Sequence, residues 1–181
     1  MELLWPLHAI LALVDQGGPV LWLIFITCTT LWLLILERLW FMRMTWPPRA
    51  RLAARDWNAR TDRSSWRARK IREATVSEAR LALFALLPLI RVLVALCPLF
   101  GLLGTVLGMI GVFEVIAISG SDDAQAMARG VYRATIPTMS GLVVALTGVY
   151  FIVRLGRIAE REAGRFNESL ALQAARQESA Q

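Results

Sequence analysis

The sequence is poor in the residues that most often build catalytic and metal sites. Its 181 residues include 2 cysteines and 1 histidine. Cys28 and Cys97 fall in apolar windows without the spacing of metal ligands, so we interpret them as small packing residues. His8 is interpreted as an interfacial residue. No nucleophile–base pair, P-loop or metal set is present, so we expect a protein that is not an enzyme and binds neither cofactor nor metal.

Charge is missing from three long windows. Residues 16–36, 92–113 and 134–153 contain no charged residue and are 21, 22 and 20 residues long. A helix needs about 20 residues to cross a bilayer. The chain is 56% hydrophobic with a mean hydropathy of +0.52, whereas soluble domains are about 45–50% apolar. The sequence therefore predicts an all-α integral membrane protein with three transmembrane helices, in preference to three buried core helices.

Lysine and arginine are absent from the first 36 residues, so no cleavable signal peptide is expected. Residues 37–80 carry twelve of these cations, and the tail after Val153 carries five. Because positive loops remain in the cytoplasm, we predict an outer N-terminus and long helices that extend into the cytoplasm. This distribution explains the pI of about 10.6 without nucleic acid, and leaves a nucleic-acid surface at residues 49–72 as the weaker alternative.

The pattern predicts one domain, residues 1–181. Its expected parts are an outer amphipathic segment (1–18), a first membrane helix (19–36), a cytoplasmic helical segment (37–91), a second membrane helix (92–118), an outer turn and helix start (119–130), a third membrane helix (131–153) and a cytoplasmic tail (154–181).

Glycine and proline predict where these helices start, end and bend. Residues 17–19 mark a break and a helix start, and residues 46–48 are expected to end the first helix. The cytoplasmic helices are expected to run into the second membrane helix, bent at Pro88 and Pro98. Ser121 or Asp122 is the expected N-cap of a third helix that continues through Arg165.

Small residues recur at helical spacing in the second and third membrane helices. Since lipid provides no hydrophobic drive for helix association, small residues favour close backbone contact. We therefore predict helix packing for Gly101, Gly104, Gly108 and Gly111, spaced 3, 4 and 3, and for Gly141, Ala145 and Gly148, spaced 4 and 3.

Two threonines are predicted to lie at one depth in the bilayer. In an antiparallel hairpin of these helices, Thr105 and Thr138 both lie about 20 Å from the outer turn, at about 1.5 Å per residue. Each hydroxyl either bonds its own helix backbone or lines a pore. The same register brings Glu114 beside Arg129, with Arg133 one turn deeper. These rim charges form either a salt-bridged edge or a charged vestibule.

The two membrane helices also lack titratable groups at depth. Residues 92–113 and 134–153 contain no Asp, Glu, Lys or His. A proton path at membrane depth usually needs such a group, and threonine cannot hold a proton charge. If this protein conducts protons, a partner must supply the carboxylate.

Taken together, these features resemble the ExbB/TolQ/MotA proton-channel family, and most closely the short ExbB proteins of TonB systems. The resemblance lies in GLLGTVLGM (residues 101–109), RATIPTMSGLVVAL (133–146), the Glu37-Arg38-Leu39 exit and the three-helix layout. It covers most of residues 17–165. The family's pore threonines match Thr105 and Thr138. Many longer ExbB and TolQ proteins carry a glutamate where this chain has Arg133, so a role for that carboxylate does not carry over. We infer that Glu114 supplies the acidic partner instead.

The resemblance implies a homopentamer in the bacterial inner membrane, with a periplasmic N-terminus and contact with lipid. The ring would surround an ExbD-like single-span protein whose aspartate carries the proton. Its motion would pass to a TonB-like protein that opens outer-membrane receptors for siderophores. The alternatives are a Tol-type motor for envelope integrity and a non-conducting scaffold. A motility stator would need a fourth membrane helix and a larger cytoplasmic domain.

Overall fold

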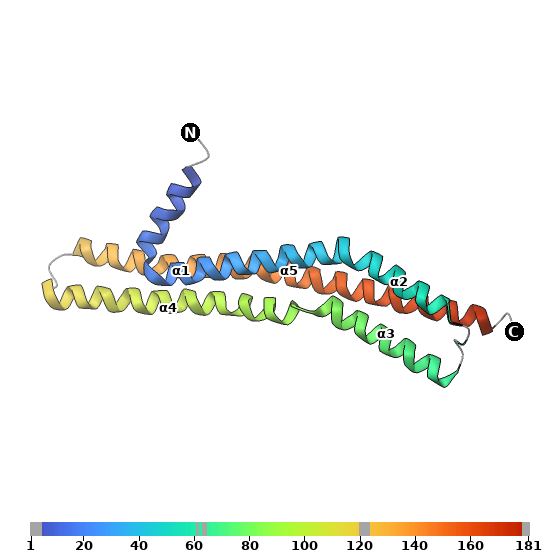
Figure 1. Ribbon diagram of the computed structural model, residues 1–181. Coiled ribbons are helices and arrows are strands. Elements are labelled where there is room, and N and C mark those ends of the chain that lie inside the picture. The colour runs from blue at the N-terminus through green and yellow to red at the C-terminus, as the bar shows by residue number, and fades with distance from the viewer. Residues whose placement is uncertain (1–4, 61, 63–64, 120–123, 179–181) are drawn as a thin grey trace. The chain divides into compact units, whose positions relative to one another are not determined.

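The protein is almost entirely helical in the part of the chain that its structure describes. The structure, a computed structural model, describes residues 5–60, 62, 65–119 and 124–178. These residues form α1 (Trp5–Trp40), the π-helix η2 (Phe41–Thr45), α2 (Trp46–Asn58), α3 (Trp66–Phe84), α4 (Leu87–Ser119) and α5 (Ala124–Glu178), with no strand among them (Figure 1). The all-α prediction is confirmed.

Three helical stretches are long and apolar enough to cross a membrane. Within the described ranges they are Gly18–Asn58, Trp66–Ile118 and Met127–Leu172, with mean hydropathies of 2.2, 2.4 and 1.9 in their most apolar windows. The prediction of three membrane helices is thereby confirmed. Which side of the membrane each end faces remains a prediction from the positive charges.

α1 is interrupted where glycine and proline predicted a break. Gly18 has φ 68° and ψ −169°, a conformation that glycine adopts without the steric cost that a Cβ would add. Pro19 follows in the first turn of the next helical segment. Backbone N–H groups there have no acceptor within the helix, so the N–H that proline lacks costs no hydrogen bond. Figure 1 shows the segment before Gly18 turning away from the segment that follows.

The predicted end of the first helix at residues 46–48 is wrong. Helical structure continues through η2 into α2, which begins at Trp46 and ends at Asn58. Pro47 and Pro48 occupy the first turn of α2, where proline is tolerated. Between α1 and α2 the helix is wound as a π-helix over η2, with hydrogen bonds to the fifth residue along instead of the fourth.

The predicted continuity between the cytoplasmic helices and the second membrane helix is also wrong. α3 ends at Phe84, and its C-cap Ala85 is extended with ψ 147°. Leu86 has φ 64°, and Pro88 therefore lies in the first turn of α4 instead of bending a continuous helix. α5 runs unbroken past Arg165 to Glu178, as predicted. The expected N-caps Ser121 and Asp122 lie outside the described residues.

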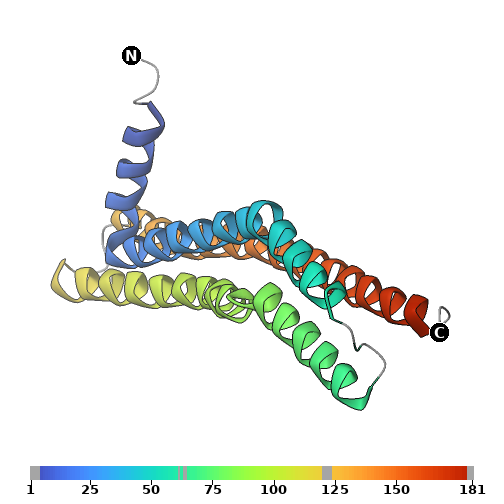
Figure 2. The same ribbon diagram turned by 45° about the vertical axis from the view of Figure 1, so that its right-hand side comes forward.

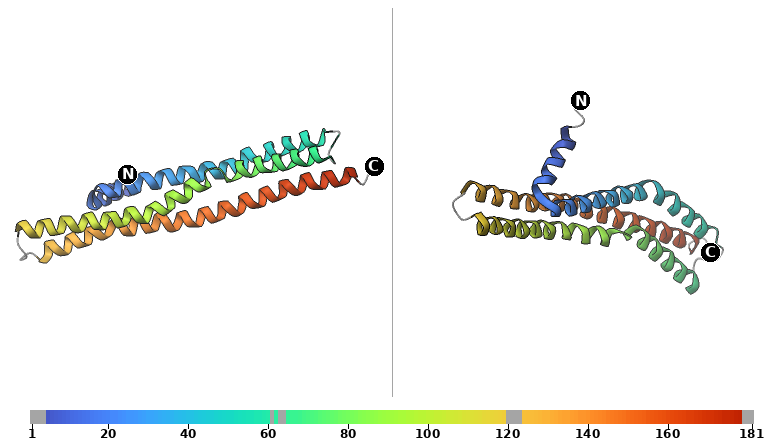
Figure 3. Two further views of the ribbon diagram at one scale, coloured as in Figure 1. Left: turned by 90° about the horizontal axis from the view of Figure 1, so that it is seen from below. Right: turned by 60° about the vertical axis from the view of Figure 1, so that its left-hand side comes forward.

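The chain divides into two compact units. Residues 1–33 and 90–150 form an apolar unit, and residues 34–89 and 151–181 form a polar unit. In the apolar unit, residues 19–33 of α1 lie along α4 and the first half of α5 (Figures 1 and 2). In the polar unit, α2 and α3 lie along the second half of α5 (Figure 3).

Aromatic and cationic contacts order the polar unit. The rings of Trp46 and Phe166 pack edge to face at 5.7 Å between centroids. Arg38 is buried, with 2% of its surface exposed. Its guanidinium lies 4.6 Å from the centre of the Phe41 ring and donates a hydrogen bond to the carbonyl of Ala82. This bond satisfies a carbonyl in the last turn of α3, where helices leave such groups without partners.

Candidate functional site

In the apolar unit, α4 and α5 meet along a seam of glycines with almost no side chain between the backbones. An added Cβ would lie 3.0 Å from the Thr138 Cα at Gly101, 2.6 Å from the Ala134 Cβ at Gly108, and 2.5 Å from the Cys97 carbonyl oxygen at Gly141. Any larger residue would push the helices apart. Glycine here permits the close backbone approach on which helix association in lipid depends.

α1 joins this seam at two levels. A Cβ at Gly104 would overlap the ring of Pro137 on α5 and lie 3.3 Å from Val20 on α1. At the second level, a Cβ at Gly148 would overlap Val94 on α4 and lie 3.2 Å from Leu31 on α1. At both positions the absence of a side chain therefore allows α1, α4 and α5 to pack together.

The remaining small residues differ in their surroundings. Ala145 is buried, with 8% of its surface exposed. A Cβ at Gly111 would meet no atom within 4 Å, so packing within the chain does not require glycine there. The prediction missed Gly130, where a Cβ would overlap Val112. Its spacing of four residues before Ala134 was the available signal, because it extends the stripe of small residues on α5.

Thr138 forms a polar contact across the seam. Its hydroxyl donates a hydrogen bond to the carbonyl of Gly101, with 3.0 Å between the oxygens. The hydroxyl of Thr105 instead bonds the carbonyl of Leu102 in its own helix at 2.7 Å. The two predicted pore threonines thus use their hydroxyls differently: Thr105 caps a carbonyl of its own turn, and Thr138 links two helices.

The other hydroxyls confirm that the contact of Thr138 is distinctive. Among the serine and threonine side chains described in the apolar unit, the others that form hydrogen bonds donate to carbonyls three or four residues earlier in the same helix: Thr27, Thr29, Thr30, Thr105, Thr135, Ser140 and Thr147. That intrahelical pattern is the default for these residues within helices. Thr138 departs from this pattern because Gly101 has no side chain, so α4 lies close enough for its backbone carbonyl to accept the hydrogen bond.

Among the described residues, Glu114 forms no ion pair with Arg129 or Arg133, so the salt-bridged form of the rim stays a prediction. Glu114, Arg129 and Arg133 are exposed, and in the described part of the chain none of them has an ion-pair partner within 4.0 Å. The contact face of α4 runs through Gly108 and Val112. At 3.6 residues per turn, Glu114 lies about 200° around the helix from Val112 and points away from the seam.

The three helices bury little of their apolar surface against one another. Only 33%, 28% and 28% of the residues in their most apolar windows are buried. Large side chains remain exposed on α4 and α5, including Phe113, Ile118, Tyr132, Met139 and Leu146. This surface is available to lipid or to further protein chains. Among the described residues, no group of three His, Cys, Asp or Glu side chains could hold a metal ion.

Comparison with known proteins gives a family for this architecture. Residues 47–168 match the profile of the MotA/TolQ/ExbB proton channel family. Two relatives are named as biopolymer transport proteins, one ExbB-like from Synechocystis sp. and one ExbB homologue from Methanothermobacter thermautotrophicus. The first is 43% identical over 61 residues, and the second 39% identical over 57 residues.

These matches are partial. Each covers 32% of this chain, and they span 24% of the Synechocystis protein and 20% of the Methanothermobacter protein. The chain therefore matches about a quarter or less of the length of either relative. No solved structure matches the chain.

Proposed function

Because the chain belongs to the MotA/TolQ/ExbB proton channel family, we propose that it is the channel subunit of an inner-membrane energy-transducing complex of the ExbB–ExbD type. The complex uses the proton motive force to drive TonB-dependent transport across the outer membrane. The family is one of channels and not of enzymes, which fits the lack of a catalytic residue set in the sequence.

The observation that carries this proposal is the hydrogen bond from Thr138 to the Gly101 carbonyl. This contact supports the proposal because it holds a hydroxyl between α4 and α5, within charge-free windows that we predict to cross the membrane. The hydroxyl is able to exchange this carbonyl for another acceptor, because threonine has one donor and a freely rotating O–H. Thr105, partly exposed on α4, supplies a second hydroxyl near the same level. Together they form the polar element of the proposed path.

The proton carrier is assigned to a partner. Between positions 92 and 113 and between 134 and 153 the chain has no Asp, Glu, Lys or His, and a proton relay at membrane depth generally uses such a group. We assign this role to the membrane carboxylate of an ExbD-like single-span protein. The exposed apolar faces of α4 and α5 support a ring of identical subunits around it, which we propose is a pentamer that acts on a TonB-like protein.

The experiment that tests this function compares two threonines of α5. Cells lacking the protein are complemented with wild type, Thr138→Val or Thr147→Val, and siderophore uptake is measured. Thr147 is the matched control because its hydroxyl bonds only carbonyls of its own helix. We expect wild type and Thr147→Val to restore uptake and Thr138→Val to fail, although all three retain the ExbD-like partner in pull-downs.

The other outcomes identify the alternatives. Full uptake with an assembled Thr138→Val protein would make the hydroxyl structural and support a non-conducting scaffold. If wild type does not affect uptake but restores resistance to detergents, the protein is a Tol-type subunit for envelope integrity.

A further inference from the structure

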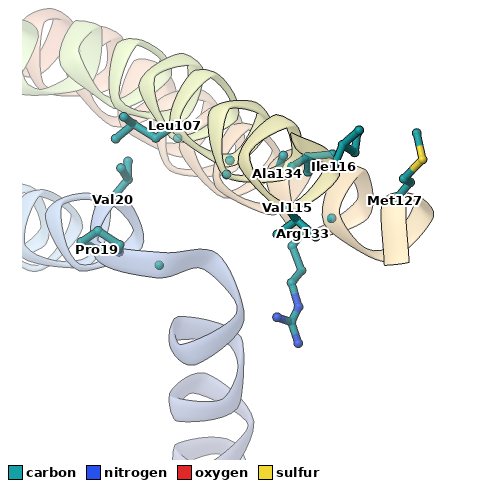
Figure 4. A pocket seen from close by; sticks show the side chains of 14 residues that line it. Pro19, Val20, Leu107, Val115, Ile116, Met127, Arg133 and Ala134 are labelled. Atoms are coloured by element: carbon teal, nitrogen blue, oxygen red, sulfur yellow. The ribbon is translucent and has the colours of Figure 1, made fainter. Parts of the chain in front are cut away.

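The apolar unit contains a cavity beside the break in α1. Its volume is about 330 Å³, and it lies between residues 18–20 of α1, residues 104–116 of α4 and residues 127–134 of α5. Figure 4 shows Pro19 and Val20 on one side and Leu107 on the other, with Arg133 at the edge. Apart from the Arg133 side chain, the lining consists of glycine, proline and apolar residues.

Glycine keeps this cavity open. Gly111 lines it, and a Cβ there would meet no atom within 4 Å. The seam glycines 104 and 108 are explained by their contacts with α5, but no contact with a described residue explains Gly111. A larger residue at this position would project into the space and fill it. The absent side chain therefore leaves room for something outside this chain.

One cation stands at the edge of this apolar space. Arg133 is the charged residue among those that line the cavity, and it is exposed without an ion-pair partner in the described part of the chain. Figure 4 shows its guanidinium extending away from α5 past the cavity edge. An arginine near the membrane is costly unless it is paired or reaches the interface, and the guanidinium fork suits the oxygens of a phosphate.

The volume of the cavity favours a hydrocarbon chain over a protein helix as its occupant. Ligand pockets have volumes of about 300–1,000 Å³, and this cavity lies at the lower end of that range. A helix is about 10–12 Å across with its side chains, and a stable protein interface buries about 800 Å² on each partner. A cavity of this volume cannot enclose a whole helix, whereas it has room for part of a flexible hydrocarbon chain.

We propose that this cavity binds one acyl chain of a membrane phospholipid, whose phosphate is held by Arg133. The apolar lining takes the chain, and the guanidinium at the edge takes the anionic headgroup. The site does not depend on the proposed channel function, because it uses neither Thr138 nor a partner protein.

Native mass spectrometry of the purified full-length protein tests the proposal. The delipidated protein is titrated with dioleoylphosphatidylglycerol and, separately, with dioleoylglycerol, which has the same chains but no phosphate. The charge variant is Arg133→Gln, and its matched control is Arg129→Gln, which removes an exposed arginine one turn away that does not line the cavity. The filling variant is Gly111→Leu, with Gly156→Leu as its control, since a Cβ at Gly156 also meets no atom within 4 Å.

We expect wild type to bind phosphatidylglycerol more tightly than the diacylglycerol. Loss of a hydrogen bond to a charged group weakens binding by about tenfold. Arg133→Gln should therefore weaken phosphatidylglycerol binding by about that factor. It should leave diacylglycerol binding unchanged, because diacylglycerol has no phosphate. Gly111→Leu should remove the binding of both lipids, and Gly111→Ala should weaken it if the leucine variant fails to fold. Arg129→Gln and Gly156→Leu should bind as wild type does.

Three results would overturn the proposal. The first is equal affinity of wild type, Arg133→Gln and Gly111→Leu for phosphatidylglycerol. In the second, Gly111→Leu changes the number of chains in the particle and not the bound lipid, which would assign the cavity to a second copy. In the third, Gly111→Leu loses only the ExbD-like protein in pull-downs, which would assign it to a partner helix.

Discussion

The hydroxyl of Thr138 on α5 donates to the carbonyl of Gly101 on α4 across 3.0 Å. This contact exists because position 101 has no side chain: a Cβ there would lie 3.0 Å from the Thr138 Cα. The closeness of the two backbones and the polar contact between them therefore have a single cause. A larger residue at position 101 would separate the helices and break the hydrogen bond as well.

The first prediction concerns the hydroxyl itself. Thr138→Ser keeps the donor and removes a methyl group, whereas Thr138→Val keeps the shape and removes the donor. We expect the serine variant to retain most of the siderophore uptake and the valine variant to lose it. The valine variant should also unfold more readily in detergent by about 0.5–1.5 kcal/mol, the net contribution of one hydrogen bond. Equal uptake by both variants would contradict a role for the hydroxyl.

The second prediction compares Gly111 and Gly141, two glycines that the sequence pattern predicts to pack between helices. Gly141→Ala places a Cβ 2.5 Å from the carbonyl oxygen of Cys97, so the helices must move apart. The expected cost is about 1–3 kcal/mol of stability. Gly111→Ala meets open space and should be neutral, or stabilising by up to about 1 kcal/mol through helix propensity. Thermal unfolding of the two proteins in one detergent measures the difference, and equal midpoints would count against the seam.

The third prediction concerns the rim charges. Because Glu114 has no ion-pair partner in the described part of the chain, the variants Glu114→Gln and Arg133→Gln should have independent effects. In a double-mutant cycle on unfolding stability, we expect additivity within about 0.3–0.5 kcal/mol. A larger coupling energy would indicate that the two charges pair, either within one subunit or between neighbours in an assembly.

The fourth prediction concerns the break between α3 and α4. Leu86 has φ 64°, a conformation that costs a residue with a Cβ about 1–2 kcal/mol. Leu86→Gly should recover part of that cost, although glycine also raises the conformational entropy of the unfolded chain and so offsets part of the gain. We expect a neutral or slightly raised unfolding temperature, compared with a clear loss for Leu83→Gly, a fully buried neighbour inside α3. A loss at Leu86 as large as that at Leu83 would contradict the strained backbone.

Hydrophobic patterning determined the fold class from the sequence alone. Charge-free windows of at least 20 residues leave a chain few stable choices in a membrane, because backbone groups must be satisfied inside a helix. The break at Gly18 was also predictable, since Gly followed by Pro is a local signal. Small residues at helical spacing predicted the close contacts at Gly108 and Gly141, but they also predicted packing at Gly111, where an added Cβ would meet no atom within 4 Å.

The tertiary structure decided the features that depend on neighbours. The sequence shows that Pro47 and Pro88 must lie at or near a helix end or bend. Only the structure shows that both lie in the first turn of a helix, because the effect of a proline depends on where the helix begins. The sequence placed Thr105 and Thr138 at one depth, yet depth does not fix rotation about a helix axis. That rotation sends the Thr138 hydroxyl to Gly101, turns Glu114 away from the arginines of α5, and leaves Gly111 facing a cavity. Such choices follow from helix packing, which no local pattern encodes.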